Sequence, residues 1–234
     1  MMRLWPRPKW DRQFWYQKIF GMEEAEKGGL FNRIKNASRT EGFVGIIITG
    51  PVGAGKSTLA IKMLRAVYGN YPVVLRHCLF FRWEDLYDAL TTAARENYAY
   101  PAVIWDDAGV YASRYLYRTG PKRAEAIAAL IQLIRTYTHC LILTAPHVTD
   151  IASFVRERPG WIHMMLWRVG KYQSKVRMGT YLESLFKIKP VESPVEFVVN
   201  TYIPRKYYNQ YCDIRRKYIL MTQANSDENN DDSD

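Results

Sequence analysis

The segment Gly50-Pro-Val-Gly-Ala-Gly-Lys-Ser combines residue types that suit the binding of a polyphosphate. Glycines permit backbone conformations that other residues avoid, so successive N–H groups can converge on phosphate oxygens. The ammonium group of Lys56 would reach the β- and γ-phosphates, and the hydroxyl of Ser57 would bind Mg²⁺. The residues that we expect to bind a nucleotide are Gly50, Pro51, Val52, Gly53, Ala54, Gly55, Lys56, Ser57 and Thr58.

The flanking residues predict the strand and the helix that such a loop requires. Val44 to Thr49 is a short apolar run rich in β-branched residues, which is typical of a strand buried on both faces. Apolar residues then recur at helical spacing from Leu59 to Val67. Strand, glycine loop and helix in this order favour a phosphate-binding loop. A glycine-rich turn that binds no ligand is the alternative.

Two adjacent acids, Asp106 and Asp107, follow the apolar run from Ala102 to Trp105. In a P-loop fold the carboxylate at this strand end meets the Mg²⁺ held by Ser57, which gives Asp106 that role. Asp107 is then placed to orient or deprotonate the attacking water. The alternative is that the two acids only cap the segment that follows.

Three further residues are candidates for roles in hydrolysis. Thr144 follows a strand, Cys140 to Leu143, that we expect beside the Asp106 strand. Its hydroxyl would hold the attacking water or sense the γ-phosphate, unless it only satisfies nearby backbone groups. Arg156 and Arg158 would neutralise transition-state charge at a neighbouring subunit's γ-phosphate if the protein is oligomeric.

Aromatic and basic residues alternate in the loop that follows the acids, and such a mixture suits base stacking and contacts with a phosphate backbone. The predicted DNA-binding residues there are Arg114, Tyr115, Arg118, Lys122 and Arg123, and a predicted hairpin adds Lys171 and Lys175. An ordinary loop whose tyrosines pack onto the core is the alternative.

The charge of the chain points to a polyanionic partner. The formal net charge is +10, and the segment 223–234 is acidic, so the remainder is more basic still.

The three cysteines are far apart, which disfavours zinc and a disulfide framework. No apolar run is long enough to span a membrane and the N-terminus lacks a signal peptide's apolar region, so we expect a cytoplasmic protein.

Apolar runs and amphipathic segments alternate along the chain, which predicts an α/β fold with a mainly parallel sheet of five or more strands between helical layers. The second strand is expected at Val73 to Cys78, a short helix at Thr149 to Glu157 and a fifth strand at Trp161 to Val169. The expected parts are an aromatic and basic segment packed on the core (1–41), a P-loop core (42–170), a β-hairpin and helix extension (171–222) and a disordered acidic tail (223–234).

With these motifs in order, the chain resembles P-loop ATPases of the additional-strand, AAA+-like group, from about Phe43 to Val169. The resemblance rests on TGPVGAGKST (Walker A), AVIWDD (Walker B), LILT ending in Thr144 (sensor 1) and the arginine-finger position at Arg156 and Arg158. The WDDAG sequence, the tyrosine and arginine loop and the C-terminal helix are similar to small ATPases of archaeal viruses and plasmids. The resemblance implies ATP, Mg²⁺ and a ring of subunits.

The chain departs from that group at two points. Asp107 stands where the group usually has a longer glutamate, so turnover is expected to be slow. The sequence after Val169 predicts strands instead of the three-helix lid, which raises the prospect of a packaging or secretion-type motor.

An ATPase that acts on DNA in replication or helicase loading is therefore the leading interpretation, with a helicase or capsid protein as a conceivable partner. A genome-packaging translocase is the alternative within the motor class. A small-molecule kinase and a nucleotide-binding scaffold with negligible hydrolysis belong to other classes. The absence of NKxD and LSGGQ-like sequences disfavours a GTPase and an ABC ATPase.

Overall fold

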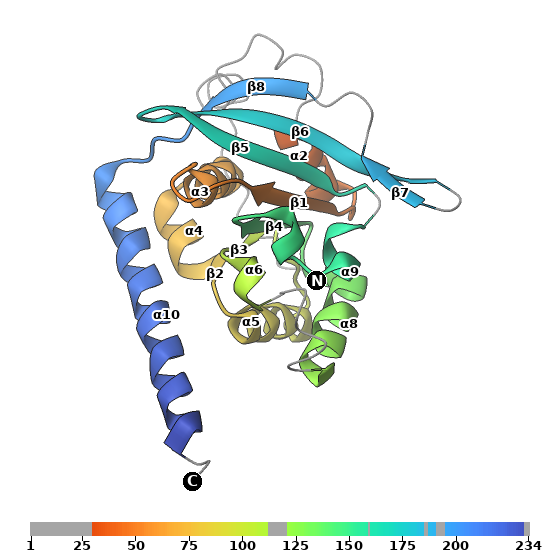
Figure 1. Cartoon of the computed structure of the whole chain (residues 1–234). Helices are drawn as coiled ribbons and strands as arrows, with labels where there is room; N and C mark the ends of the chain where they lie inside the picture. The colour runs from red at the N-terminus through yellow and green to blue at the C-terminus, as the bar shows by residue number, and fades with distance from the viewer. Residues whose placement is uncertain (1–29, 112–120, 159, 185–186, 191–194, 232–234) are drawn as a thin grey trace. The chain divides into compact units, whose positions relative to one another are not determined.

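The structure is a computed structural model that describes residues 30–111, 121–158, 160–184, 187–190 and 195–231 (Figure 1). The chain divides into two compact units, Met1–Tyr202 and Ile203–Asp234, and each is described by itself. The aromatic residues of 1–29, which we expected to pack on the core, lie outside the described residues. None of the helices in these ranges is long and apolar enough to cross a membrane.

The first unit is built on one sheet with the strand order β2-β3-β4-β1-β5-β6-β7, and β8 pairs with β6. The strands are β1 (Val44–Thr49), β2 (Leu79–Phe80), β3 (Val103–Trp105), β4 (Cys140–Ala145), β5 (Ile162–Gly170), β6 (Gln173–Ser184), β7 (Lys187–Pro190) and β8 (Val195–Asn200). Strands β1 to β5 are parallel, and β6, β7 and β8 pair antiparallel. Since β4 lies between β1 and β3, an additional strand separates the glycine loop from the two acids.

Helices cover both faces of the parallel strands. The helices of the first unit are α2 (Leu30–Arg39), α3 (Lys56–Tyr68), α4 (Tyr71–His77), α5 (Trp83–Arg95), α6 (Ala108–Tyr111), α8 (Pro121–Tyr137), the 3₁₀ helix η2 (Val148–Asp150) and α9 (Ser153–Arg156). Apolar residues of α5 and α8 share a buried cluster with Ile47, Trp105 and Leu143. On the opposite face α2 and α3 contact β1 and β4. The chain therefore has the three-layer α/β architecture of a P-loop NTPase that the sequence predicts.

The predicted strand at Val73 to Cys78 is wrong, because this stretch forms most of helix α4 and only Leu79–Phe80 form strand β2. The side chain of Asn70 caps the helix by accepting a hydrogen bond of 2.9 Å from the backbone N–H of Val73. Pro72 lies in the first turn, where its missing N–H costs nothing. The cap and the proline outweigh the β-propensity of the two valines.

The predicted helix at Thr149 to Glu157 is divided in two. Ile151 separates η2 from α9 with an extended backbone (φ −89°, ψ 134°), and its side chain is fully buried. Burial of the Ile151 side chain in the core stabilises the extended backbone at this position, so the helix is interrupted there.

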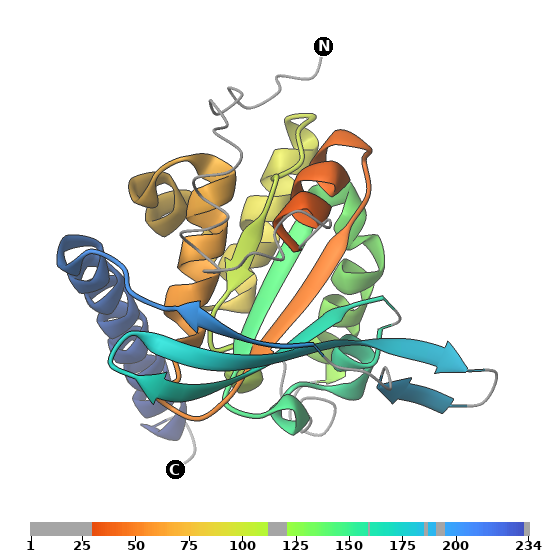
Figure 2. The same ribbon diagram turned by 90° about the horizontal axis from the view of Figure 1, so that it is seen from above.

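Beyond β5 the first unit is β-rich, as the sequence predicts. Figure 2 shows β5 and β6 as a long hairpin along one edge of the sheet, with β8 beside it. Leu166, Val176 and Val199 are fully buried, whereas Lys175 and Arg177 on the other face of β6 are exposed. The alternation is that of an antiparallel sheet with one solvated face.

The second unit contains helix α10 (Arg205–Asp231), which begins directly after Pro204. The helix continues through residues 223–231, which we expected to be disordered. A helix once formed adds residues at low cost, since each added residue gains one hydrogen bond.

Candidate functional site

The glycine loop connects the end of β1 to the start of α3, and at each end its backbone is closely packed against another part of the chain. Gly50 has a φ of +142°, and a Cβ at this position would lie 2.3 Å from the carbonyl oxygen of Leu166 on β5. Gly55 caps α3 with a φ of +85°, and its Cβ would lie 2.8 Å from Thr201 Cγ2. Only glycine fits at these two positions. The loop thus ends at the N-terminus of a 13-residue helix, and the free N–H groups of a first helical turn favour an anion.

Lys56 is buried and turned onto the loop that carries it. Its ammonium group donates hydrogen bonds to the carbonyl oxygens of Gly50 (2.8 Å) and Pro51 (3.1 Å). Ser57 follows in the first turn of α3 and is half-buried. The Thr58 hydroxyl donates to the Gly55 carbonyl oxygen at 2.9 Å. A positive charge, a hydroxyl and the first turn of a helix are therefore held together at the end of β1.

Asp106 and Thr144 meet at the carboxyl ends of two adjacent parallel strands. The register pairs Trp105 with Leu143, so the next residues of β3 and β4 lie opposite one another. The Thr144 hydroxyl donates to Asp106 Oδ1 at 2.5 Å, and both side chains are fully buried. The structure thus brings together two of the predicted site residues, and the prediction that their strands are neighbours is confirmed.

Asp107 adopts a left-handed backbone conformation with a φ of +53°. Its N–H donates to Thr144 Oγ1 at 2.9 Å, so one threonine hydroxyl contacts both acids. Aspartate is among the few non-glycine residues that tolerate this conformation. Strained residues of this kind concentrate at functional sites. Asp107 is half-buried, in contrast to the fully buried Asp106.

The β5–β6 hairpin holds the outer side of the glycine loop. Arg168 Nη1 donates to the Gly53 carbonyl oxygen at 2.5 Å, and the buried hydroxyl of Ser174 donates to the Ala54 carbonyl oxygen at 2.7 Å. Sequence reasoning missed both residues, because they lie 115 and 120 positions from their partners and belong to no motif.

The predicted arginine-finger residues lie apart from this site. Arg156 is paired with Glu157 at 2.8 Å and donates to the Ile151 carbonyl oxygen at 2.9 Å, while Arg158 donates to the Phe154 carbonyl oxygen. Both precede β5, whose amino end is at the opposite edge of the sheet from the glycine loop. A role for either arginine at a phosphate thus requires a second copy of the chain.

His163 on β5 is a structural residue. Its Nε2 lies 2.9 Å from the Arg156 carbonyl oxygen, and burial lowers the pKa of the imidazole to about 4. A neutral ring that donates Nε2–H to a carbonyl fits this environment. The thiols of Cys78 and Cys140 are buried, as expected of small core residues.

The predicted DNA-binding residues are placed only in part. Arg114, Tyr115 and Arg118 lie outside the described residues, as does the side chain of Arg123. Lys122 and Lys171 are exposed. Lys175 forms an ion pair of 2.6 Å with Glu196 on β8.

The residues present fit a nucleotide with its magnesium ion. Within the described ranges no three His, Cys, Asp or Glu side chains gather to hold a metal. Mg²⁺ is ordinarily bound by one or two carboxylates together with substrate phosphates, and Asp106 with Ser57 would supply the protein's share. Such an ion would supply charge neutralisation at the phosphates.

Comparison with known proteins gives two viral relatives. The chain is 31% identical over 156 residues to an uncharacterized protein, ORF286, of Acidianus two-tailed virus. This match covers 66% of this chain and 50% of the viral protein. The chain thus spans about half the length of that protein. It is 29% identical over 206 residues to uncharacterized protein B-251 of Sulfolobus spindle-shape virus 1, covering 81% of this chain and 80% of that one. No family model matches.

Two solved structures are similar at low scores. The N-terminal domain of zonular occludens toxin from Neisseria meningitidis has a TM-score of 0.42 and 13% identity, covering 71% of this chain and 97% of that domain. A KaiC-like protein from Pyrococcus horikoshii OT3 has a TM-score of 0.25 and 16% identity. The match covers 68% of this chain and 89% of that protein. The assignment of a P-loop NTPase fold rests on the motif and the strand order.

Proposed function

We propose that this protein is a Mg²⁺-dependent ATPase that acts on DNA. The observation that carries the proposal is the meeting of three elements at one edge of the sheet. The glycine loop with Lys56 lies at the end of β1, and the Asp106–Thr144 pair lies at the ends of the adjacent β3 and β4. Ligands of open α/β sheets bind at the carboxyl ends of the strands.

The residues divide the work of hydrolysis between them. Lys56 and the loop N–H groups would bind the phosphates, and Ser57 with Asp106 would hold the magnesium ion. Asp107, more exposed than Asp106, would orient or deprotonate the attacking water. Thr144 would fix both acids through its hydrogen bonds to each of them.

The proposed biological role is replication or helicase loading in a virus or mobile element, in the host cytoplasm. The formal charge of +10 supports a DNA partner, and the two viral relatives support the setting. A ring of subunits would let Arg156 or Arg158 reach a neighbouring site. Genome packaging is the second candidate. The part after β5 is β-rich where AAA+ proteins have a helical lid, and this difference supports a packaging motor.

ATP hydrolysis measured with and without single- or double-stranded DNA tests this function, with molecular mass measured on the same samples. We expect DNA to stimulate hydrolysis and the protein to assemble with ATP. The variant Lys56→Ala should lose nucleotide binding or turnover. Asp107→Asn should bind ATP and lose about a hundredfold or more in turnover, because it removes the proposed base.

The opposite results would point elsewhere. Wild-type turnover by Lys56→Ala would refute the site. A persistent monomer without DNA stimulation would favour a small-molecule kinase or a nucleotide-binding scaffold. Movement along duplex DNA would favour packaging, and single-strand or origin binding would favour replication.

A further inference from the structure

The tip of the β5–β6 hairpin lies beside the glycine loop. Strand β5 pairs with β1 as far as Met165 opposite Thr49, where β1 ends. It then continues to Gly170, and five residues at about 3.3 Å each carry the chain roughly 16 Å past the end of β1. Both ribbon views place the hairpin turn next to the start of α3 (Figures 1 and 2).

The strand order determines which end of a nucleotide would face this hairpin. In the sheet β1 lies between β4 and β5. Asp106 and Thr144, on the β4 side, mark the position of the γ-phosphate under the proposed function. The backbone N–H groups of the glycine loop, at the end of β1, would bind the α- and β-phosphates. The nucleoside would therefore leave the loop on the opposite side, toward β5 and its hairpin.

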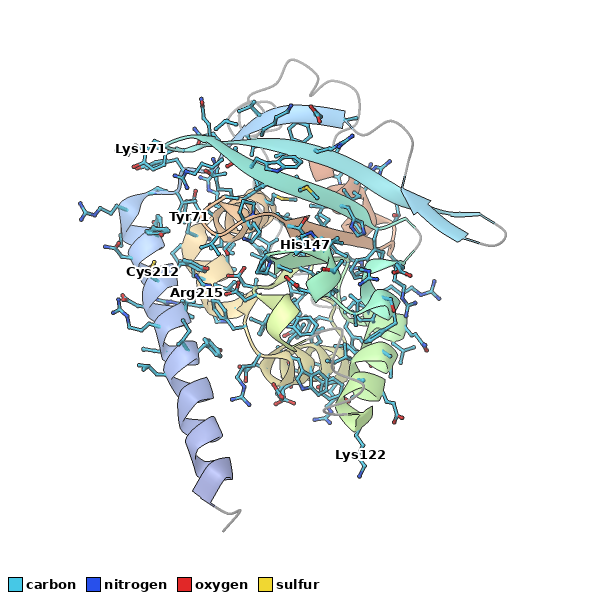
Figure 3. All side chains as sticks on the ribbon, viewed as in Figure 1. Tyr71, Lys122, His147, Lys171, Cys212 and Arg215 are labelled. Atoms are coloured by element: carbon cyan, nitrogen blue, oxygen red, sulfur yellow. The ribbon has the colours of Figure 1, made fainter. Side chains whose placement is uncertain are left out.

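Two exposed tyrosines lie on that side. Tyr172 in the hairpin turn and Tyr202 after β8 pack edge to face with ring centroids 5.0 Å apart, and they are 45% and 44% exposed. Thr201, which contacts Gly55, donates its N–H to the Tyr172 carbonyl oxygen at 2.8 Å. The pair is thus connected to the N-cap of α3 through one residue. Lys171, labelled at the hairpin turn in Figure 3, has its ammonium group 5.4 Å from the Tyr172 ring centre.

We propose that Tyr172 and Tyr202 form the stacking surface for the nucleobase. The inference rests on the proposed function, since it assigns the nucleoside end of the same site. The two ring planes lie 72° apart, so a planar base can stack on an open face of one ring while the other ring meets it edge on, and such a stack contributes measurably to binding. Every base has a π-face, so stacking alone separates a nucleotide from a bare polyphosphate better than it separates ATP from GTP.

The test compares binding of Mg²⁺-ATP, Mg²⁺-GTP and Mg²⁺-tripolyphosphate by calorimetry. Tyr172→Ala and Tyr202→Ala should each weaken ATP and GTP by about tenfold and leave tripolyphosphate unchanged. Tyr172→Phe and Tyr202→Phe should keep wild-type affinity, because they retain the ring. Tyr87→Ala is the matched control, since Tyr87 is an exposed tyrosine on α5 at 39% exposure.

The three ligands distinguish the possible failures. Wild-type ATP affinity in both alanine variants would overturn the stacking site and leave the proposed function standing. Equal weakening of ATP and tripolyphosphate would also overturn it, because the tyrosines would then act through the shape of the loop. A wild-type protein that binds none of the three ligands would refute the proposed function itself.

Discussion

Thr144 organises the two acids through one hydroxyl group. It donates to Asp106 Oδ1 and accepts from the Asp107 N–H, so its orientation is determined from both sides. The acceptor bond also stabilises the left-handed backbone of Asp107, which would otherwise cost about 1–3 kcal/mol. The positions of the proposed metal ligand and the proposed base therefore depend on a residue that need not touch a nucleotide.

Thr144→Val, which keeps the shape and removes the hydroxyl, should reduce ATP turnover by ten- to a hundredfold. The reason is that small displacements of catalytic groups have effects of this size. Nucleotide affinity should stay near that of the wild type, because the glycine loop is unaltered. Thr144→Ser restores the hydroxyl and is the control. Normal turnover in the valine variant would show that the acids do not need this positioning.

At the scale of elements, the glycine loop depends on strands that lie more than a hundred residues away. The Ser174 hydroxyl and Arg168 bind the carbonyl oxygens of Ala54 and Gly53, and Lys62 on α3 donates to the Asn200 carbonyl oxygen at 2.5 Å. The β-rich extension is therefore part of the support of the glycine loop and helix α3.

Ser174→Ala should lower the free energy of unfolding by about 1–3 kcal/mol, because a buried carbonyl oxygen loses its donor. A loss of this kind corresponds to a fall in melting temperature of about 2–4 °C per kcal/mol for a chain of this size. Lys175→Ala, the next residue on β6, removes an exposed ion pair and should change stability by less than about 1 kcal/mol. Equal melting temperatures for the two variants would argue against the proposed support.

At the scale of the whole molecule, one copy of the chain does not bring Arg156 or Arg158 to its own glycine loop. Arg156 and Arg158 precede β5 at the amino edge of the sheet, whereas the glycine loop lies at the carboxyl edge. An assembly in which one subunit completes the site of the next would reconcile the two positions.

Mixing two inactive variants tests for a shared site. Lys56→Ala and Arg158→Ala should each have little ATPase activity alone, and the arginine variant should bind ATP normally. Mixed together, they should recover part of the activity, since some interfaces combine an intact loop with an intact arginine. Arg156→Ala is tested in the same way. The absence of recovery in a mixture shown to co-assemble would exclude a shared site for that arginine.

The sequence by itself determined the glycine loop, the two acids and the order of the main elements. These features are local: a loop of this type needs glycines, a lysine and a hydroxyl at fixed spacing, and buried parallel strands need continuous apolar runs. The sequence also predicted that Thr144 ends a strand beside Asp106 and that strands follow β5. It misassigned Val73 to Cys78, where the cap at Asn70 determines the structure.

Only the tertiary structure decided how the distant parts meet. The hydrogen bonds of Ser174 and Arg168 to the loop, the contact of Thr201 with Gly55 and the Tyr172–Tyr202 pair join residues with no shared motif or period. Such contacts depend on strand order and on how far β5 extends past β1. Those properties follow from long-range packing, in which the pairing of one strand constrains every strand beyond it, so no local pattern of residues encodes them.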